Sequence, residues 1–140
     1  MNYWLVKSEP GTWSWDDQVR DGTTHWDGVR NYQARGHLQN MKCGDLAFFY
    51  HSIKQTSIVG IVEVVREYYP DHTDESGKFG MVDFQAVRAV ERPVSLAEMK
   101  ATPELAHLGL IKQSRLSVMP IDAASWEIIL NMSKETSEID

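Results

Sequence analysis

Alternating apolar and polar residues predict several β-strands along the chain. Residues 2–10, NYWLVKSEP, alternate in this way, and the strand should end at Pro10-Gly11. Further stretches are rich in the β-branched and aromatic residues that strands favour. They are residues 46–51, 57–69, 81–90 and 115–121. Pro93 lacks the N–H that a sheet ladder needs, so it should interrupt the ladder after residue 90.

Capping patterns and helical spacing predict short helices between these strands. Ser14 precedes Asp17 in the arrangement of a capping box, and Gly22 can close that helix. Asn31 can cap a second helix, in which apolar residues recur at helical spacing. The predicted helices are 14–22, 31–41, 95–100 and a last one that starts at Asp122.

This order of elements indicates an α+β fold. Five or six strands interspersed with short helices are typical of a small curved sheet or barrel, and the alternation is too irregular for a doubly wound parallel sheet. Residues 70–80 should form a polar loop, and residues 101–113 show a mixed pattern. The 140 residues fit one domain, which we place at residues 1–133, followed by a flexible acidic tail at 134–140.

Composition excludes several classes of protein. With 42% hydrophobic and 24% charged residues, the chain is typical of a globular fold and not of a disordered one. No apolar run reaches the length that crosses a bilayer, and the first residues do not resemble a signal peptide. We therefore expect a cytoplasmic protein, nuclear if the source is eukaryotic, with no membrane partner. Cys43 is the only cysteine, which excludes an internal disulfide, and we interpret it as a small buried hydrophobe.

The charge is unevenly distributed along the chain. The net charge is -6, which argues against a protein that coats nucleic acid through many phosphate contacts. Residues 1–60 are balanced, so residues 61–140 carry the whole excess of acids. The segment 26–42, WDGVRNYQARGHLQNMK, combines aromatic, amide and guanidinium groups with a single acid. A local positive site on an acidic body would favour a few specific contacts.

Signatures of catalysis and metal binding are weak. Ser8, Asp45 and His51 are the residue types of a nucleophilic triad, but no G-x-S-x-G elbow surrounds them. The histidines lack the spacing of known metal motifs. Acids and a histidine within 71–75 could hold a hard cation weakly, although a solvated loop is the favoured interpretation. No glycine-rich phosphate cradle is present. We predict neither a cofactor nor a metal.

A pocket for a single nucleobase explains the remaining residues better. Such a pocket needs aromatic walls for stacking, fixed polar groups for the base edge and cations for flanking phosphates. The candidate walls are Trp4, Trp26, Tyr32, Phe49 and Tyr50. The candidate polar groups are Ser8, Asn31, His51 and Ser52. The candidate cations are Lys7, Arg30, Arg35 and Arg115.

Structural roles compete with these assignments. Trp4 and Trp126 are better interpreted as core residues. Trp26 differs, because it lies in a polar loop before a helix, where a core tryptophan is less expected. Asn31 has a strong alternative role as a helix cap, and one amide can do both jobs only by dividing its donors and acceptor.

Several motifs together resemble the EVE domain family. They are YWLVKSEP (3–10), WDGVRNYQAR (26–35), MKCGDLAFFYHS (41–52), YYPD (68–71) and SRLSVMPI (114–121). Their order and extent, from residue 2 to about residue 132, make the match specific. The resemblance implies a PUA-like curved β-barrel flanked by short helices, similar also to YTH domains. It further implies recognition of modified cytosine or related bases in DNA, or of modified nucleosides in RNA.

The resemblance also implies a set of site residues. Those expected at the base pocket are Ser8, Trp26, Val29, Asn31, His51 and Ser52. Those expected at the rim are Lys7, Ser114 and Arg115, and the pattern of cations adds Arg30 and Arg35 for flanking phosphates. Ile53 and Gly36 depart from the family pattern, so the preferred base does not transfer.

We therefore predict a non-enzymatic reader of a modified base, acting as a monomer or weak homodimer. Two alternatives remain open at this point. One is a small enzyme that acts on a nucleoside-like substrate with His51 as acid or base, and the other is a domain whose groove binds a peptide.

Overall fold

A six-stranded mixed sheet forms the centre of the computed structural model, which describes residues 1–53 and 55–134. The strands are β1 (Tyr3–Ser8), β2 (Thr23–His25), β3 (Leu46–His51), β4 (Ser57–Pro70), β5 (Gly80–Ser95) and β6 (Val118–Ile121). Their order is β2-β5-β4-β3-β1-β6, with β1 parallel to β3 and the other neighbours antiparallel. The predicted α+β class is confirmed. Most of the predicted tail, residues 135–140, lies outside the described residues.

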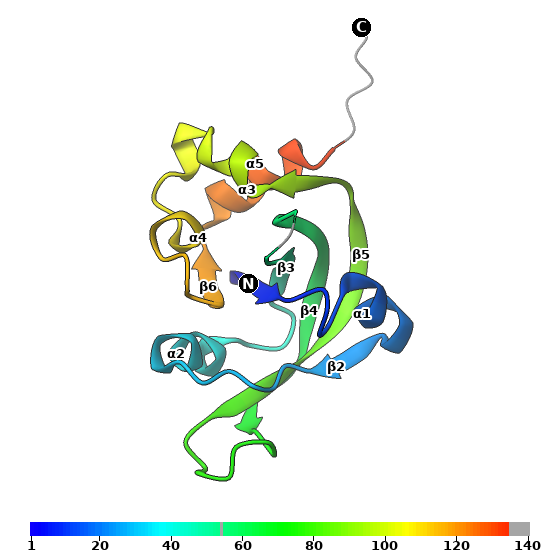
Figure 1. Cartoon of the computed structure of the whole chain (residues 1–140), viewed down its shortest axis with the longest axis vertical. Helices are drawn as coiled ribbons and strands as arrows, with labels where there is room; N and C mark the ends of the chain where they lie inside the picture. The colour runs from blue at the N-terminus through cyan, green and yellow to red at the C-terminus, as the bar shows by residue number, and fades with distance from the viewer. Residues whose placement is uncertain (54, 135–140) are drawn as a thin grey trace, which may run out of the picture.

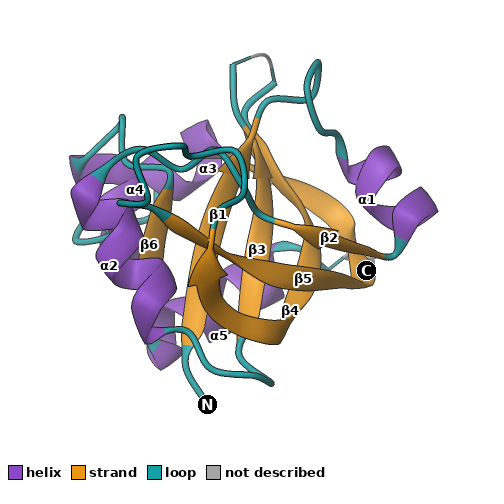
Figure 2. Ribbon diagram, turned by 90° about the horizontal axis from the view of Figure 1, so that it is seen from below, coloured by secondary structure: helices purple, strands orange, loops and turns teal. Residues whose placement is uncertain are grey.

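Short helices surround the curved sheet (Figures 1 and 2). They are α1 (Trp15–Asp21), α2 (Tyr32–Asn40), α3 (Leu96–Lys100), α4 (Gly109–Lys112) and α5 (Ala123–Met132), with a 3₁₀ turn η1 (Pro103–Leu105). Helix α1 lies against β2 and β5, whereas α2 and α4 lie beside β6. Within the described part of the chain, no helix has the length and apolar character that crossing a bilayer requires.

The predicted caps are present. Ser14 and Asp17 form a reciprocal capping box at the start of α1. The Asn31 side chain accepts the Ala34 N–H at 2.9 Å at the start of α2, and Asp122 accepts the Ser125 N–H at the start of α5. These contacts satisfy N–H groups that the first helical turn leaves without partners.

Trp4 and Trp126 belong to the core, as expected. Trp126 is 2% exposed and stacks on Phe48 with ring centroids 3.8 Å apart. Trp4 donates its indole N–H to the buried Asp45 carboxylate at 3.0 Å. Asp45 thus occupies a buried position in the turn before β3. Cys43, two residues earlier, is exposed, so the prediction of a buried Cys43 is wrong.

The expectation for Pro93 is met only in part, and one strand was not predicted. Pro93 does not end β5, which continues to Ser95. The pairing with β4 is interrupted between Ala89 and Val94, as expected, by a register shift that contains Pro93, and it resumes at Val94. Strand β2 was not predicted, because its three residues show no alternation of their own and are extended by pairing with β5.

The loop between β4 and β5 is less solvated than predicted. Asp71 is buried, and its carboxylate accepts the Gly28 N–H at 2.8 Å and a hydrogen bond from Arg30 at 3.0 Å. Thr73 donates its N–H and its hydroxyl to the same carboxylate. Asp71 therefore joins this loop to the segment that follows β2.

Candidate functional site

A cavity of about 500 Å³ lies between β2 and the end of β1. One side consists of Lys7–Glu9 with Thr12 and Trp13, and the other consists of the segment 24–30. Ser117, just before β6, completes the lining. These segments are far apart in the sequence. The curvature of the sheet brings its β2 edge close to β1 near the opposite edge.

Trp26 is both a core residue and a wall of this cavity. Its side chain is 9% exposed and packs edge-to-face against Phe49 at 5.6 Å and Phe84 at 5.4 Å. The backbone N–H of Trp26 donates to the Val82 carbonyl at 2.7 Å. This bond extends the pairing of β2 with β5 and holds the indole over the sheet. Trp26 does lie in the loop after β2, as expected, but the expectation that it stands outside the core is wrong. The residue lines the cavity as well.

Trp13 is a second indole at the cavity that was not predicted from the sequence. Its ring N–H donates to Gln18 at 2.9 Å, and Gln18 is completely buried. Ser8 donates its hydroxyl to the Trp13 carbonyl, which folds the loop back over the end of β1. The only available signal for Trp13 was its position directly before the Ser14 cap.

The predicted pocket residues divide into groups. Ser8, Trp26 and Val29 line the cavity. Asn31 instead lines a neighbouring hollow of about 330 Å³, formed with residues 112–116. Ser52 is not among the described residues that line either space; its N–H donates to the Ser8 carbonyl at 2.9 Å.

His51 faces away from the cavity and supports α1. Its Nε2 accepts the Trp15 N–H at 3.0 Å, and the residue lines a different hollow beside Pro10 and Ser95. Burial lowers the pKa of His51, although the negative charge of Asp16 opposes the shift. A neutral imidazole whose acceptor nitrogen is already occupied is suited to positioning the helix.

Among the described residues, the other predicted aromatic walls are not part of the cavity lining. Trp4, Phe49 and Tyr50 are buried in the core, where Phe49 supports Trp26 from behind. Tyr32 is 58% exposed, at the start of α2.

The predicted cations also differ in their environments. Lys7 lines the cavity and donates to the Ser114 carbonyl at 2.8 Å, and burial lowers the pKa of Lys7. Arg115 is exposed and lines the neighbouring hollow with Ser114. The contact between Lys7 and Ser114 therefore connects the cavity with that hollow.

Arg30 and Arg35 hold the loop between β4 and β5. Arg30 lines the cavity but directs its guanidinium to Asp71 and Thr73. Arg35 donates to the Lys78 carbonyl at 2.9 Å and lies over the Tyr32 ring, 4.7 Å from its centroid. Both guanidinium groups have partners within the protein.

Comparison with known proteins places the chain in a family. A family model described as the EVE domain matches residues 2–132. The chain belongs to the EVE family. The resemblance inferred from the motifs is thus confirmed. Thymocyte nuclear protein 1 of Gallus gallus is 39% identical to this EVE protein, over 95% of this chain and 69% of that protein.

Solved structures agree with this assignment. The NMR structure of a Rhodopseudomonas palustris protein has a TM-score of 0.90 and 51% identity, and the match covers 95% of this EVE chain and 93% of that chain. The crystal structure of human THYN1 protein in complex with 5-methylcytosine containing DNA has a TM-score of 0.91 and 36% identity. That match covers 97% of this chain and 99% of the human chain.

A more distant likeness supports the fold. The YTH domain of Zygosaccharomyces rouxii MRB1 protein, in complex with N6-methyladenosine RNA, has a TM-score of 0.59 at 15% identity. At this identity the likeness concerns the fold alone, and it agrees with the PUA-like architecture expected for this EVE protein.

Proposed function

We propose that this EVE protein binds nucleic acid that carries a modified base, and that the base enters the cavity between β1 and β2. The base would be a modified cytosine or a related base in DNA, or a modified nucleoside in RNA. The proposal rests on the similarity to the human THYN1 protein, whose structure is a complex with 5-methylcytosine containing DNA. The two structures match over 97% of this chain with a TM-score of 0.91.

The cavity has the composition that a flipped base requires. Its volume of about 500 Å³ falls within the range of small-molecule pockets, roughly 300–1,000 Å³. Trp13 and Trp26 offer apolar aromatic surface, and Ser8, Thr12 and Thr24 bring hydroxyl groups to the lining. Aromatic stacking and a few polar contacts are the means by which proteins hold an extruded base.

The neighbouring hollow is suited to the nucleic-acid backbone. Lys7 lines the cavity and donates to Ser114, which lines the neighbouring hollow together with Arg115. The Lys7 ammonium has further donors besides the one that Ser114 accepts, and Arg115 is exposed. We therefore assign phosphate contacts to these two residues, whereas Arg30 and Arg35 hold the protein's own loop. Few phosphate contacts are consistent with a net charge of -6.

One experiment separates this function from the enzymatic and peptide-binding alternatives. The protein is mixed with modified DNA and RNA oligonucleotides, binding is measured by fluorescence anisotropy over a range of salt, and the oligonucleotides are then weighed by mass spectrometry. We expect affinity to fall as salt rises and the mass to stay unchanged. A changed mass would indicate an enzyme, and the absence of binding to every oligonucleotide would contradict the proposal.

Trp13→Ala is expected to weaken binding of a modified oligonucleotide by about 1–3 kcal/mol, because stacking on the base is lost. Trp13 is only partly buried, so the folded state should persist. The measurement is anisotropy at fixed salt, with Tyr32→Ala as control, because Tyr32 is an exposed aromatic residue outside the cavity. Equal losses in the two variants would remove Trp13 from the binding site.

We further propose that the protein acts in the cytoplasm, or in the nucleus if its source is eukaryotic. The name of the Gallus gallus relative assigns that protein to the nucleus. A monomer or weak homodimer remains our prediction for its assembly.

A further inference from the structure

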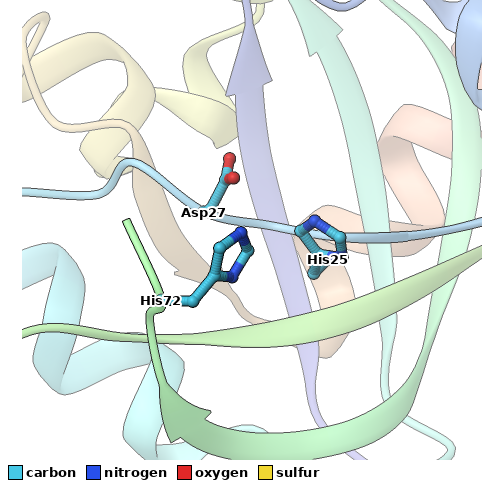
Figure 3. A group of neighbouring side chains, drawn as sticks. All are labelled: His25, Asp27 and His72. Atoms are coloured by element: carbon cyan, nitrogen blue, oxygen red, sulfur yellow. The ribbon is translucent and has the colours of Figure 1, made fainter. Parts of the chain in front are cut away.

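Two histidines and an aspartate meet beside the cavity. Figure 3 shows His25, Asp27 and His72, which come from β2, the segment after it and the loop between β4 and β5. One ligand atom of each lies within 4.8 Å of the others, and all three residues are exposed. We propose that these three residues bind a divalent transition-metal ion of the Zn²⁺ class.

The backbone segments that carry these residues are held together by Asp71. This buried carboxylate accepts the N–H of Gly28, next to Asp27, and it also accepts hydrogen bonds from Thr73. His72 lies between Asp71, which carries this carboxylate, and Thr73, which donates its N–H and its hydroxyl to it. The separation of Asp27 and His72 is therefore set by buried contacts, although their side chains reach the surface.

His25 is positioned by the sheet. It pairs with Asp83 of β5, and the next residue, Trp26, donates its N–H to Val82. The His25 and His72 rings lie edge-to-face with centroids 5.1 Å apart. Within the described residues, none of the three proposed ligand side chains forms a hydrogen bond or ion pair. Their donor atoms are thus available to an external ligand.

The donor set selects the class of ion. Imidazole suits Zn²⁺, Cu²⁺ and Ni²⁺, whereas Ca²⁺ and Mg²⁺ prefer more oxygen ligands than one carboxylate supplies. Ligand bonds of about 2.0–2.2 Å in a tetrahedron would bring the donor atoms to roughly 3.4 Å from one another. Small rotations of exposed side chains can close that gap. A fourth position would remain for water, and since His25 and Asp27 line the cavity, the ion would lie at its edge.

The proposal is tested on the 140-residue chain, without a histidine tag and without nucleic acid, so the outcome does not depend on the proposed function. After treatment with a chelator and dialysis, Zn²⁺ is added and the bound ion is measured by calorimetry and elemental analysis. We expect one ion per chain, and we expect His25→Ala and His72→Ala each to abolish this binding. His107→Ala is the control, because His107 is an exposed histidine beside Asp122, away from the cluster.

NMR of the native protein tests whether His25 and His72 bind the ion. Zn²⁺ should shift the ring signals of His25 and His72 and leave those of His51 and His107 unchanged. Three results would each overturn the proposal. They are the absence of stoichiometric binding to the native protein, retained binding in either histidine variant, and shifts confined to the other histidines. The last two results would identify an adventitious ion elsewhere.

Discussion

Trp26→Ala is expected to lower the free energy of unfolding by about 3–5 kcal/mol, the usual cost of removing a large buried aromatic side chain. The indole is 9% exposed and packs against Phe49 and Phe84, so its removal leaves a cavity inside the core. Chemical denaturation of the native and variant proteins provides the measurement. The midpoint of thermal unfolding should fall by roughly 10 °C or more.

Trp13→Ala is the matched control, because it removes the second indole at the same cavity from a partly buried position. We expect its effect on unfolding to be clearly smaller than that of Trp26→Ala. A small effect of Trp26→Ala, within about 0.5 kcal/mol of the native protein, is typical of surface substitutions. That result would contradict the double role of Trp26 as core residue and cavity wall.

Asp71→Ala is expected to cost about 3 kcal/mol of stability and to weaken base binding. Removing one partner of a buried ion pair costs about 3–5 kcal/mol, and the lower end applies because the Arg30 side chain is 39% exposed and can be hydrated. The Gly28 N–H would lose its acceptor at the same time. Since Gly28 and Arg30 line the cavity, that wall should become disordered. Denaturation and oligonucleotide anisotropy measure the two effects.

Glu75→Ala is the control, since it removes an exposed acid from the same loop. The response to acid is a second test. Burial by itself would raise the pKa of Asp71, but hydrogen bonds from Thr73, Gly28 and Arg30 hold it well below its usual value. This stabilisation is present above about pH 4 and is lost as the pH falls further. The native protein should therefore lose more stability in acid than Asp71→Ala, and parallel curves would contradict this role.

Local signals in the sequence were sufficient for much of the fold. The Ser14 box, the Asn31 cap and the Asp122 cap were predicted because each depends on residues three positions apart. Strands β3 and β4 were predicted because they are rich in β-branched and aromatic residues. Where tertiary pairing decides the structure, prediction failed. Strand β2 is extended because β5 pairs with it, and Pro93 is accommodated by a bulge that only the ladder with β4 reveals.

The candidate site was only partly predictable for the same reason. Trp26 was identified from its polar sequence context and Val29 from the family motif, and both line the cavity. His51 was selected as a polar group and through the family motif that ends the predicted strand 46–51, but the structure uses its Nε2 to hold the first turn of α1. Arg30 was identified as a cation without its buried partner, because Asp71 is far away in the chain.

The histidine cluster shows this limit most clearly. The spacing of the histidines excludes the familiar metal motifs, which depend on ligands close in sequence. His72 reaches His25 and Asp27 only because Asp71 brings its loop to the segment after β2. A site assembled across loops in this way leaves no spacing signature.

The central claim, that the cavity selects a modified base, is tested most directly by paired oligonucleotides that differ at one base. The native protein is titrated against DNA and RNA strands in which a single cytosine or adenine is modified or left unmodified, at fixed salt. We expect at least one modified strand to bind about tenfold or more tightly than its unmodified twin, since an added group that fits an apolar pocket contributes about 1–3 kcal/mol. Equal dissociation constants within every pair would contradict the account.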